Sequence, residues 1–244
     1  GLLLSFIMKI DIRHTVNLGD FLNSLPVLSG LSKQLNEKFE LIVRGEMKRF
    51  NHFKEFIEFQ PFINEVLYDD DYFFQIVNGI TLSSITREDK QVEYRPTETC
   101  RYQNWLKDNH GIDVEVDDAF ILSVDELNLP INDTAYCADR WSRPLTDGRR
   151  VSNGLSHLDN VTFLDYNNTL MENAYIIKKC KKFISCFTGT AIIADLLNRE
   201  QTVLWTDELK NWDNKPIQKS FEKHFYTNRK SKLMYIGDYE NNIL

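Results

Sequence analysis

Short apolar runs and helical apolar stripes alternate along the first third of the chain. The runs at 9–13, 39–43 and 63–68 have the length and composition of buried strands. Apolar residues spaced three or four apart predict helices over 21–35 and 48–59. Strands that alternate with helices in this way are typical of βαβ units, so the sequence predicts a parallel sheet.

The second half of the chain repeats this alternation. Four apolar runs predict strands at 134–137, 161–164, 183–186 and 202–205. Helical spacing predicts helices at 170–179, 190–198 and 215–225. The repeated pattern indicates a second α/β half with a parallel sheet of its own.

The middle of the chain is harder to assign. The segment 72–97 mixes short apolar runs with polar residues, and a helix is expected over 99–109, ending at His110 and Gly111. The following segment, 113–123, fits either a strand or an extended linker. A proline among turn-forming residues at 129–133 gives the predicted boundary between two domains, 1–130 and 131–244.

Composition restricts the class of protein. The chain has 244 residues and a formal net charge of −7, so no strong overall attraction to nucleic acid or to a membrane is expected. Its 4 cysteines form no Cys-x-x-Cys pair, which predicts neither a metal site nor a disulfide framework and suits a cytoplasmic protein. The apolar start, 1–7, is too short to span a bilayer, so no transmembrane segment is predicted.

The most informative segment for chemistry is 12–26. It reads as the end of a strand, a turn containing Gly19, and a helix with Asp20 in its first turn. Parallel sheets bind ligands at the carboxyl ends of their strands, which is where this aspartate would lie. His14 and Asn17 belong to the same turn, and His14 could assist Asp20 or contact an acceptor. The simpler alternative is a helix start where Asp20 contributes only ~0.3–1 kcal/mol.

A second candidate site follows the predicted strand at 183–186. Thr188, Gly189 and Thr190 stand at a helix start, where free N–H groups and a glycine favour an anion. Arg140 belongs to an arginine-rich segment, 140–150. One guanidinium group can bind two phosphate oxygens at once. The alternative for Thr188 and Gly189 is a strand-to-helix turn without a ligand. The alternative for Arg140 is a solvated basic loop.

Two motifs resemble the ADP-heptose:lipopolysaccharide heptosyltransferases, glycosyltransferase family 9. The first is Leu-Gly-Asp-Phe-Leu at 18–22 followed by Ser-Leu-Pro at 24–26. The second runs from Thr-Leu-Met-Glu at 169–172 through Thr-Gly at 188–189 to the strand at 202–205. The resemblance implies an α/β protein of the GT-B fold, with two Rossmann-like domains facing a cleft. It places the acceptor in the N-terminal domain and the nucleotide sugar in the C-terminal domain.

The resemblance also implies a reaction and roles for residues. Asp20 corresponds to the catalytic base, while Arg140, Thr188, Gly189 and Thr190 correspond to groups that hold the donor diphosphate. The implied reaction moves a hexosyl, pentosyl or heptosyl group from a nucleotide sugar to a hydroxyl group, with inversion of configuration. It needs no metal, and the only cofactor-like molecule is the nucleotide sugar itself, as co-substrate.

The chain departs from the family pattern at two positions. Phe187 stands where an acidic residue is expected, and Ile192 stands where the helix carries a histidine. These changes argue for a donor other than ADP-heptose, or for a non-catalytic protein that only binds a sugar nucleotide. Glu172 and Asp195 could face the cleft, but a position on the helix surface is the simpler interpretation for both.

The acceptor has two candidates. One is a glycan or lipid-linked sugar of the lipopolysaccharide type. The other is hydroxymethylated DNA, as in bacteriophage DNA glycosyltransferases, which would place the protein in the host cytoplasm. The arginine-rich segment and the lysines of 178–182 would then contact phosphates. The sequence identifies neither the donor sugar, the nucleotide nor the oligomeric state.

An alternative site consists of Asp69, Asp70 and Asp71, which follow the predicted strand at 63–68. Carboxylates at this spacing can hold a divalent cation and a sugar diphosphate, as in metal-dependent GT-A glycosyltransferases. The alternative is a solvated acidic loop at the end of a strand.

Overall fold

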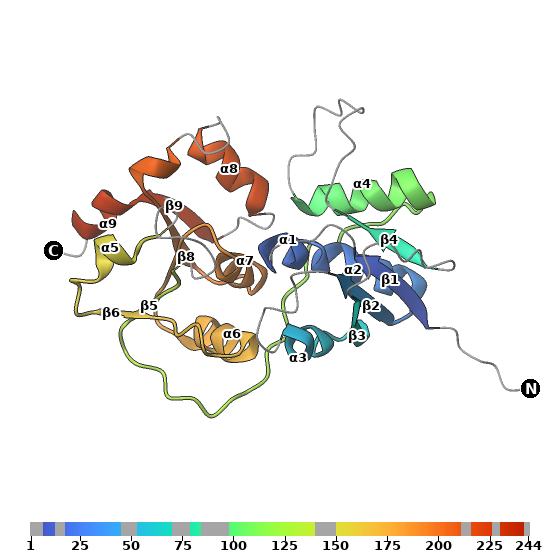
Figure 1. Cartoon of the computed structure of the whole chain (residues 1–244), viewed down its shortest axis with the longest axis horizontal. Coiled ribbons are helices and arrows are strands. Elements are labelled where there is room, and N and C mark those ends of the chain that lie inside the picture. The colour runs from blue at the N-terminus through green and yellow to red at the C-terminus, as the bar shows by residue number, and fades with distance from the viewer. Residues whose placement is uncertain are drawn as a thin grey trace, which may run out of the picture. The chain divides into compact units, whose positions relative to one another are not determined.

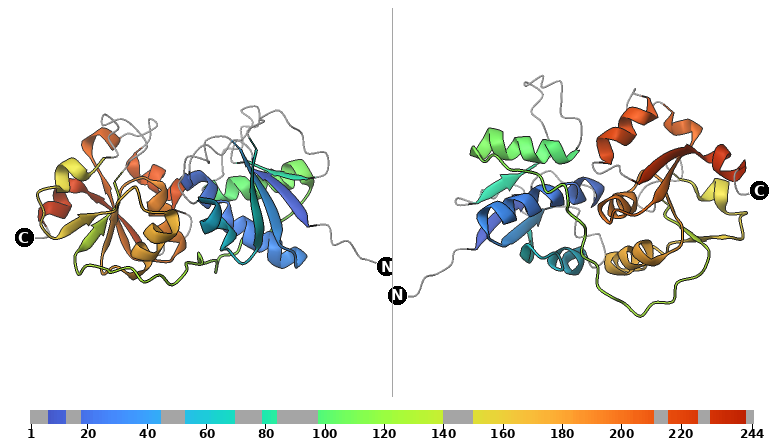
Figure 2. Two further views of the ribbon diagram at one scale, coloured as in Figure 1. Left: turned by 60° about the horizontal axis from the view of Figure 1, so that its bottom comes forward. Right: turned by 180° about the vertical axis from the view of Figure 1, so that it is seen from behind.

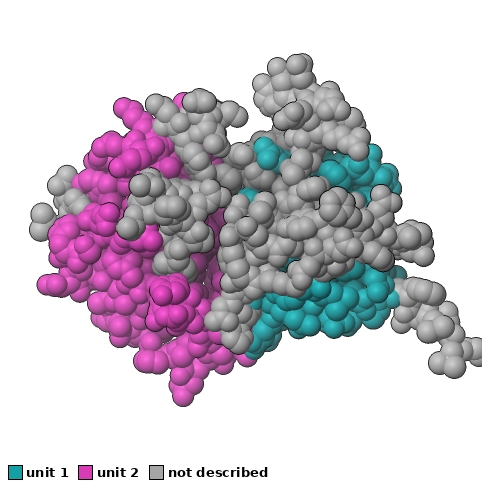
Figure 3. Space-filling model, viewed as in Figure 1, with its two compact units in different colours: residues 1–123 teal, residues 124–244 magenta. Residues whose placement is uncertain are grey.

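The computed structural model describes most of the chain as two compact units, residues 1–123 and 124–244 (Figures 1 and 3). The described residues are 7–12, 18–44, 53–69, 79–83, 98–139, 150–210, 216–225 and 230–241. The predicted domains, 1–130 and 131–244, differ from these units in the segment 124–130. None of the helices in the described part of the chain combines the length and the hydropathy of a membrane span.

Unit 1 contains a parallel sheet of four strands in the order β3-β2-β1-β4. The strands are β1 (Met8–Ile12), β2 (Phe39–Arg44), β3 (Ile63–Asp69) and β4 (Ile80–Leu82), and the helices are α1 (Leu18–Leu22), α2 (Leu25–Leu35), α3 (Phe53–Glu58) and α4 (Glu98–His110). After β1 the chain adds β2 and β3 on one side, then returns to place β4 on the other side. The strand order therefore reverses between β1 and β4, and such reversals position ligands in α/β proteins.

The predicted helix over 21–35 is divided into α1 and α2. Ser24 ends α1, since its backbone N–H and its hydroxyl both donate to the carbonyl of Phe21, at 2.9 and 2.6 Å. Pro26 then lies in the first turn of α2, where its missing N–H costs nothing. The break separates the short helix that carries Asp20 from the longer helix that packs on the sheet.

An extended segment, 112–123, crosses α2 and completes unit 1. Gly111 ends α4 with φ +66°, and the next N–H bonds back to Leu106 at 3.2 Å, as at many helix ends. The backbone N–H of Asp117 donates to the carbonyl of Pro26 at 3.1 Å. The segment contains no strand, so of the two predictions for 113–123 the extended linker is the correct one.

Unit 2 contains a parallel sheet of five strands in the order β6-β5-β7-β8-β9 (Figure 2). The strands are β5 (Ala135–Cys137), β6 (Val161–Phe163), β7 (Phe183–Ser185), β8 (Gln201–Trp205) and β9 (Ser231–Tyr235), and the helices are α5 (Ser152–Leu155), α6 (Leu170–Lys179), α7 (Gly189–Leu196), α8 (Ile217–His224) and α9 (Ile236–Asn241). This sheet reverses between β5 and β7, so unit 2 has its own ligand-binding position.

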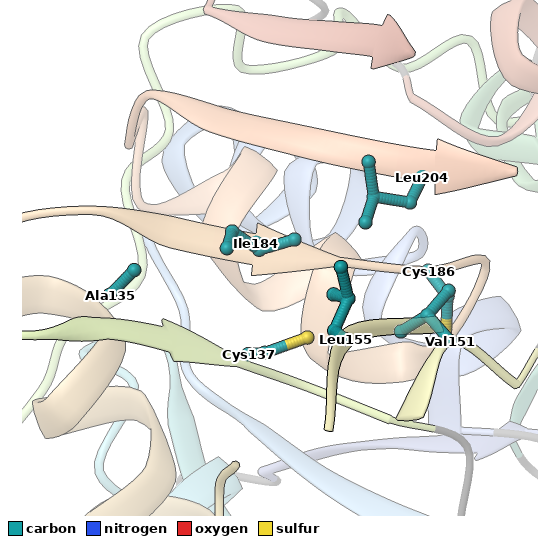
Figure 4. Close-up of a cluster of buried hydrophobic side chains, with 7 residues drawn as sticks. All are labelled: Ala135, Cys137, Val151, Leu155, Ile184, Cys186 and Leu204. Carbon is teal, nitrogen blue, oxygen red and sulfur yellow. The ribbon is translucent and has the colours of Figure 1, made fainter. Parts of the chain in front are cut away.

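The two faces of this sheet are covered by different helices. On one face, Ile184, Cys186 and Leu204 pack with Val151 and Leu155, next to α5 and α9 (Figure 4). On the opposite face, the side chain of Gln201 contacts α7. Alternation along the strands thus separates an apolar cluster from the face on which α7 lies.

Candidate functional site

Asp20 lies in α1, directly downstream of β1 and next to the strand-order reversal of unit 1. Asp20 and Gly19 are partly exposed, whereas Leu18, Phe21 and Leu22 of the same helix are buried. The helix thus presents its carboxylate residue at the surface while its apolar residues anchor it. This is a suitable position for a general base.

Two aromatic side chains fix the position of α1. The ring of Phe21 packs edge-on against Phe53 of α3, with centroids 4.9 Å apart. The hydroxyl of Tyr102, a fully buried residue of α4, donates to the backbone carbonyl of Asp20 at 2.7 Å. Sequence reasoning missed Tyr102, because no local motif in the predicted helix over 99–109 marks this tyrosine as a contact of Asp20.

In unit 2, Thr188, Gly189 and Thr190 join β7 to α7. Thr188 has an extended backbone, with φ −136° and ψ 169°, and makes no side-chain capping bond among the described residues. The hydroxyl oxygens of Thr188 and Thr190 lie 2.7 Å apart. A glycine between two hydroxyl side chains at a helix start offers N–H and O–H donors to an anion.

A buried hydrogen-bond network holds α7 on the sheet. The amide nitrogen of Gln201 donates to the carbonyl of Ala191 at 2.9 Å and to the hydroxyl of Ser231 at 2.8 Å. Its amide oxygen accepts from Ser185 at 2.9 Å, and Ser231 donates to Asp195 at 3.3 Å. Because these groups come from three strands and α7, they fix the helix that begins at the candidate anion site.

Asp195 is buried, whereas Glu172 is partly exposed in the first turn of α6. Asp195 is 2% exposed and belongs to the network around Gln201, so its surface interpretation is wrong. Glu172 accepts from the backbone N–H of Thr169 at 2.7 Å, and Thr169 accepts in return from the N–H of Glu172. This reciprocal pair caps the start of α6 and explains the Thr-Leu-Met-Glu motif without a ligand.

Three predicted site residues, His14, Asn17 and Arg140, lie outside the described residues. The described structure resumes at Arg150, and the next backbone N–H, of Val151, donates to Asp139 at 3.0 Å. Asp139 follows β5, the strand beside β7, and Val151 lies close to Cys186 (Figure 4). The described residues that flank the arginine-rich segment, Asp139 and Val151, therefore meet at the same edge of the sheet as Thr188.

The described residues give no metal centre. Among them, no group of three or more His, Cys, Asp or Glu side chains could hold a metal ion. Cys137, Cys180 and Cys186 are buried and form no disulfide with one another, and burial raises the pKa of the Cys137 thiol. β3, whose last residue is Asp69, is an edge strand away from the reversal, and Asp70 and Asp71 lie outside the described part of the chain.

Lysines near the end of α6 are paired with acidic side chains. Lys178 and Lys179 each approach Glu126 at 2.8 Å, and hydrogen bonds from both lower the pKa of that carboxyl to about 2. Lys181 lies 3.4 Å from Asp133. This charge balance weakens the expectation that these lysines contact nucleic-acid phosphates.

The sequence matches no protein-family model and no curated protein, but the fold matches solved structures. The E. coli heptosyltransferase WaaC with ADP aligns over 97% of this chain and 99% of its own, at 10% identity and a TM-score of 0.60. E. coli ADP-heptose lps heptosyltransferase II aligns over 93% and 90%, at 11% identity and 0.59. A glycosyl transferase family 9 structure from Veillonella parvula aligns over 97% and 88%, at 12% identity and 0.58. The chain therefore has the GT-B fold of the heptosyltransferases, as its motifs predicted.

Proposed function

We propose that this protein is a glycosyltransferase that moves a sugar from a nucleotide-sugar donor to a hydroxyl acceptor. The observation that carries the proposal is the turn Thr188–Thr190, at the start of α7 and beside the strand-order reversal of a GT-B fold. One similar structure, an E. coli heptosyltransferase, was solved with ADP-2-deoxy-2-fluoro heptose, which is a nucleotide sugar.

In the proposed reaction, Asp20 takes the proton of the acceptor hydroxyl as its oxygen attacks the anomeric carbon. The bond from that carbon to the diphosphate oxygen breaks, and the nucleoside diphosphate leaves with the bonding electrons. A single direct displacement inverts the configuration. Donors at Thr188, Gly189 and Thr190, together with Arg140, stabilise the charge that grows on the diphosphate.

The proposed reaction needs no metal, because the N–H groups and hydroxyls of the Thr188 turn, with the guanidinium of Arg140, would supply positive potential to the diphosphate. The alternative in which Asp69 and Asp71 bind a metal assumed a GT-A fold. The chain has a GT-B fold, which argues against that alternative. A sugar-nucleotide-binding protein without catalysis stays the second candidate, because Phe187 and Ile192 replace two polar residues of the family motif.

For the acceptor we favour a glycan or lipid-linked sugar over hydroxymethylated DNA. The protein has a net charge of −7, and three lysines of the 178–182 cluster are paired with Glu126 and Asp133. DNA binding depends on phosphate neutralisation and falls steeply with salt. Salt-dependent binding of hydroxymethylated duplex DNA would reverse this preference.

The test is a thermal-shift titration with ADP, UDP, GDP and CDP and their sugar conjugates, in EDTA and in Mn²⁺. A ligand at about 100 times its Kd adds ~2.7 kcal/mol to the free energy of unfolding. We expect one nucleotide family to raise the melting temperature in EDTA, and Thr188→Val with Thr190→Val to abolish the shift. Stabilisation only with Mn²⁺ would contradict the metal-free proposal, and no stabilisation by any compound would refute nucleotide-sugar binding.

A further inference from the structure

An aromatic pair lies at the carboxyl edge of the unit 2 sheet, beyond the Thr188 turn. Trp205 ends β8 and Tyr235 ends β9, and the two residues are direct partners in the parallel register. Their ring centroids are 4.9 Å apart, with the planes tilted by 55°, and both side chains are partly exposed. Sequence reasoning gave neither residue a role.

The aromatic pair shares a sheet face with α7. Side chains alternate along a strand, so Gln201 and Trp205, at odd positions of β8, project to the same face. Gln201 bonds the backbone of α7, so this is the face that α7 covers. Since α7 begins just after β7, its start and the aromatic pair lie at the same edge of that face.

The groups beside the aromatic pair are acidic. The hydroxyl of Tyr235 donates to Asp207 at 3.0 Å, and both Asp207 and Glu208 are exposed. A hydrogen bond from Thr206 lowers the pKa of Glu208, which favours its charged form. Two carboxylates repel a phosphate but accept hydrogen bonds from hydroxyl groups, and one carboxylate accepts about four. The surface therefore suits an uncharged, hydroxyl-rich group.

We propose that Trp205, Tyr235 and Asp207 form the subsite for the transferable sugar of the donor. The ring faces take the C–H surface of the sugar, because aromatic faces are electron-rich, and Asp207 accepts from its hydroxyls. Adjacent strands lie about 4.8 Å apart, so β8 is within reach of a sugar bonded directly to a phosphate at the start of α7. This inference rests on the proposed function and names the residues that select the sugar.

The experiment compares nucleoside diphosphates with their sugar conjugates by calorimetric titration. The probes are ADP with ADP-glucose, UDP with UDP-glucose, and GDP with GDP-mannose, used on the full chain without acceptor. We expect Trp205→Ala to weaken binding of the nucleotide sugar by about tenfold while leaving binding of the matching diphosphate unchanged. Trp205→Phe should restore most of the loss, and Asp207→Asn should weaken only the sugar conjugate.

The outcomes separate this inference from the proposed function. An equal loss of diphosphate and sugar conjugate in Trp205→Ala would assign the pair to the nucleotide instead, and no loss at all would remove it from the donor site. Either result overturns the subsite while the glycosyltransferase proposal stands. If the wild-type chain binds none of the six probes and CDP and its sugar conjugate also give no thermal shift, both proposals fail. If Trp205→Ala does not fold, the same comparison is made with Asp207→Asn and Tyr235→Phe, because both variants retain the two aromatic rings.

Discussion

At the residue scale, buried polar side chains hold the segments that carry the candidate site. Tyr102 bonds the backbone of Asp20, and Gln201 bonds the backbone of α7. Neither contact could be predicted from the sequence, because each joins segments far apart in the chain and follows no local motif. Asp20 and Thr188 were accessible to sequence reasoning because each stands in a strand–turn–helix pattern.

Tyr102→Phe tests whether the anchoring of Asp20 matters for turnover. The variant retains the ring and loses only the hydroxyl that donates to the Asp20 carbonyl, so we expect ~1 kcal/mol of lost stability. If Asp20 is the base, kcat should fall more than KM rises. The matched control is Tyr136→Phe, whose hydroxyl accepts from Asn132 at 2.9 Å in unit 2. Equal kinetic effects of the two variants would contradict a positioning role for Tyr102.

Asp117 gives unit 1 a pH-dependent contact. Burial would raise its pKa, but hydrogen bonds from Lys33 and Ser29, both at 2.6 Å, hold the pKa below its usual value. The contact therefore stabilises the fold above pH ~4 and is lost as the pH falls through the lowered value. We expect Asp117→Asn to cost about 1 kcal/mol at pH 7 and progressively less as the pH falls below ~4 and through the lowered pKa. A pH-independent difference in melting temperature would contradict this assignment.

At the element scale, the sequence predicted the regular βαβ portions and failed at irregular ones. The helix over 170–179 is observed as predicted, because an apolar stripe and a capping motif agree there. β4 was missed because its three residues are too short to show a period, and β9 because no apolar run of its own was recognised. The division of the 21–35 helix follows from Ser24 and Pro26, which periodicity alone does not register.

The contact between α2 and the extended segment depends on Gly30. A Cβ atom there would lie 2.0 Å from the carbonyl oxygen of Glu115, so Gly30→Ala should destabilise the protein by ~1–3 kcal/mol despite the better helix propensity of alanine. At Gly111 the space is open and φ is +66°, so Gly111→Asn should be tolerated. Chemical denaturation measures both, and a neutral or stabilising Gly30→Ala would refute the close packing.

The cap of α6 gives a second prediction at this scale. Thr169→Ala removes the acceptor for the N–H of Glu172, so we expect a loss of ~1 kcal/mol in the free energy of unfolding. Thr169→Ser retains the oxygen and should restore most of that stability. An effect on nucleotide binding without an effect on stability would show that the motif serves the ligand and not the helix.

At the scale of the whole molecule, the two units repeat one plan. Each is a parallel sheet whose strand order reverses once, and each places its candidate residues after a strand next to that reversal. The α/β class and the two parallel sheets were predictable because strands and helices alternate along the chain. The GT-B fold was predictable only from the resemblance of two motifs to the heptosyltransferases. The order of the strands and the polar networks depend on tertiary contacts, and no local pattern specifies them.

The central claim is that Asp20 is the base of a glycosyl transfer, and one comparison tests it most directly. The donor identified by thermal shift is titrated against wild type and Asp20→Asn, and turnover of both is followed as release of the nucleoside diphosphate with a glycan acceptor. We predict unchanged donor affinity and a loss of turnover of at least about a hundredfold in Asp20→Asn. Turnover at the wild-type rate in Asp20→Asn, with donor still bound, would contradict the account.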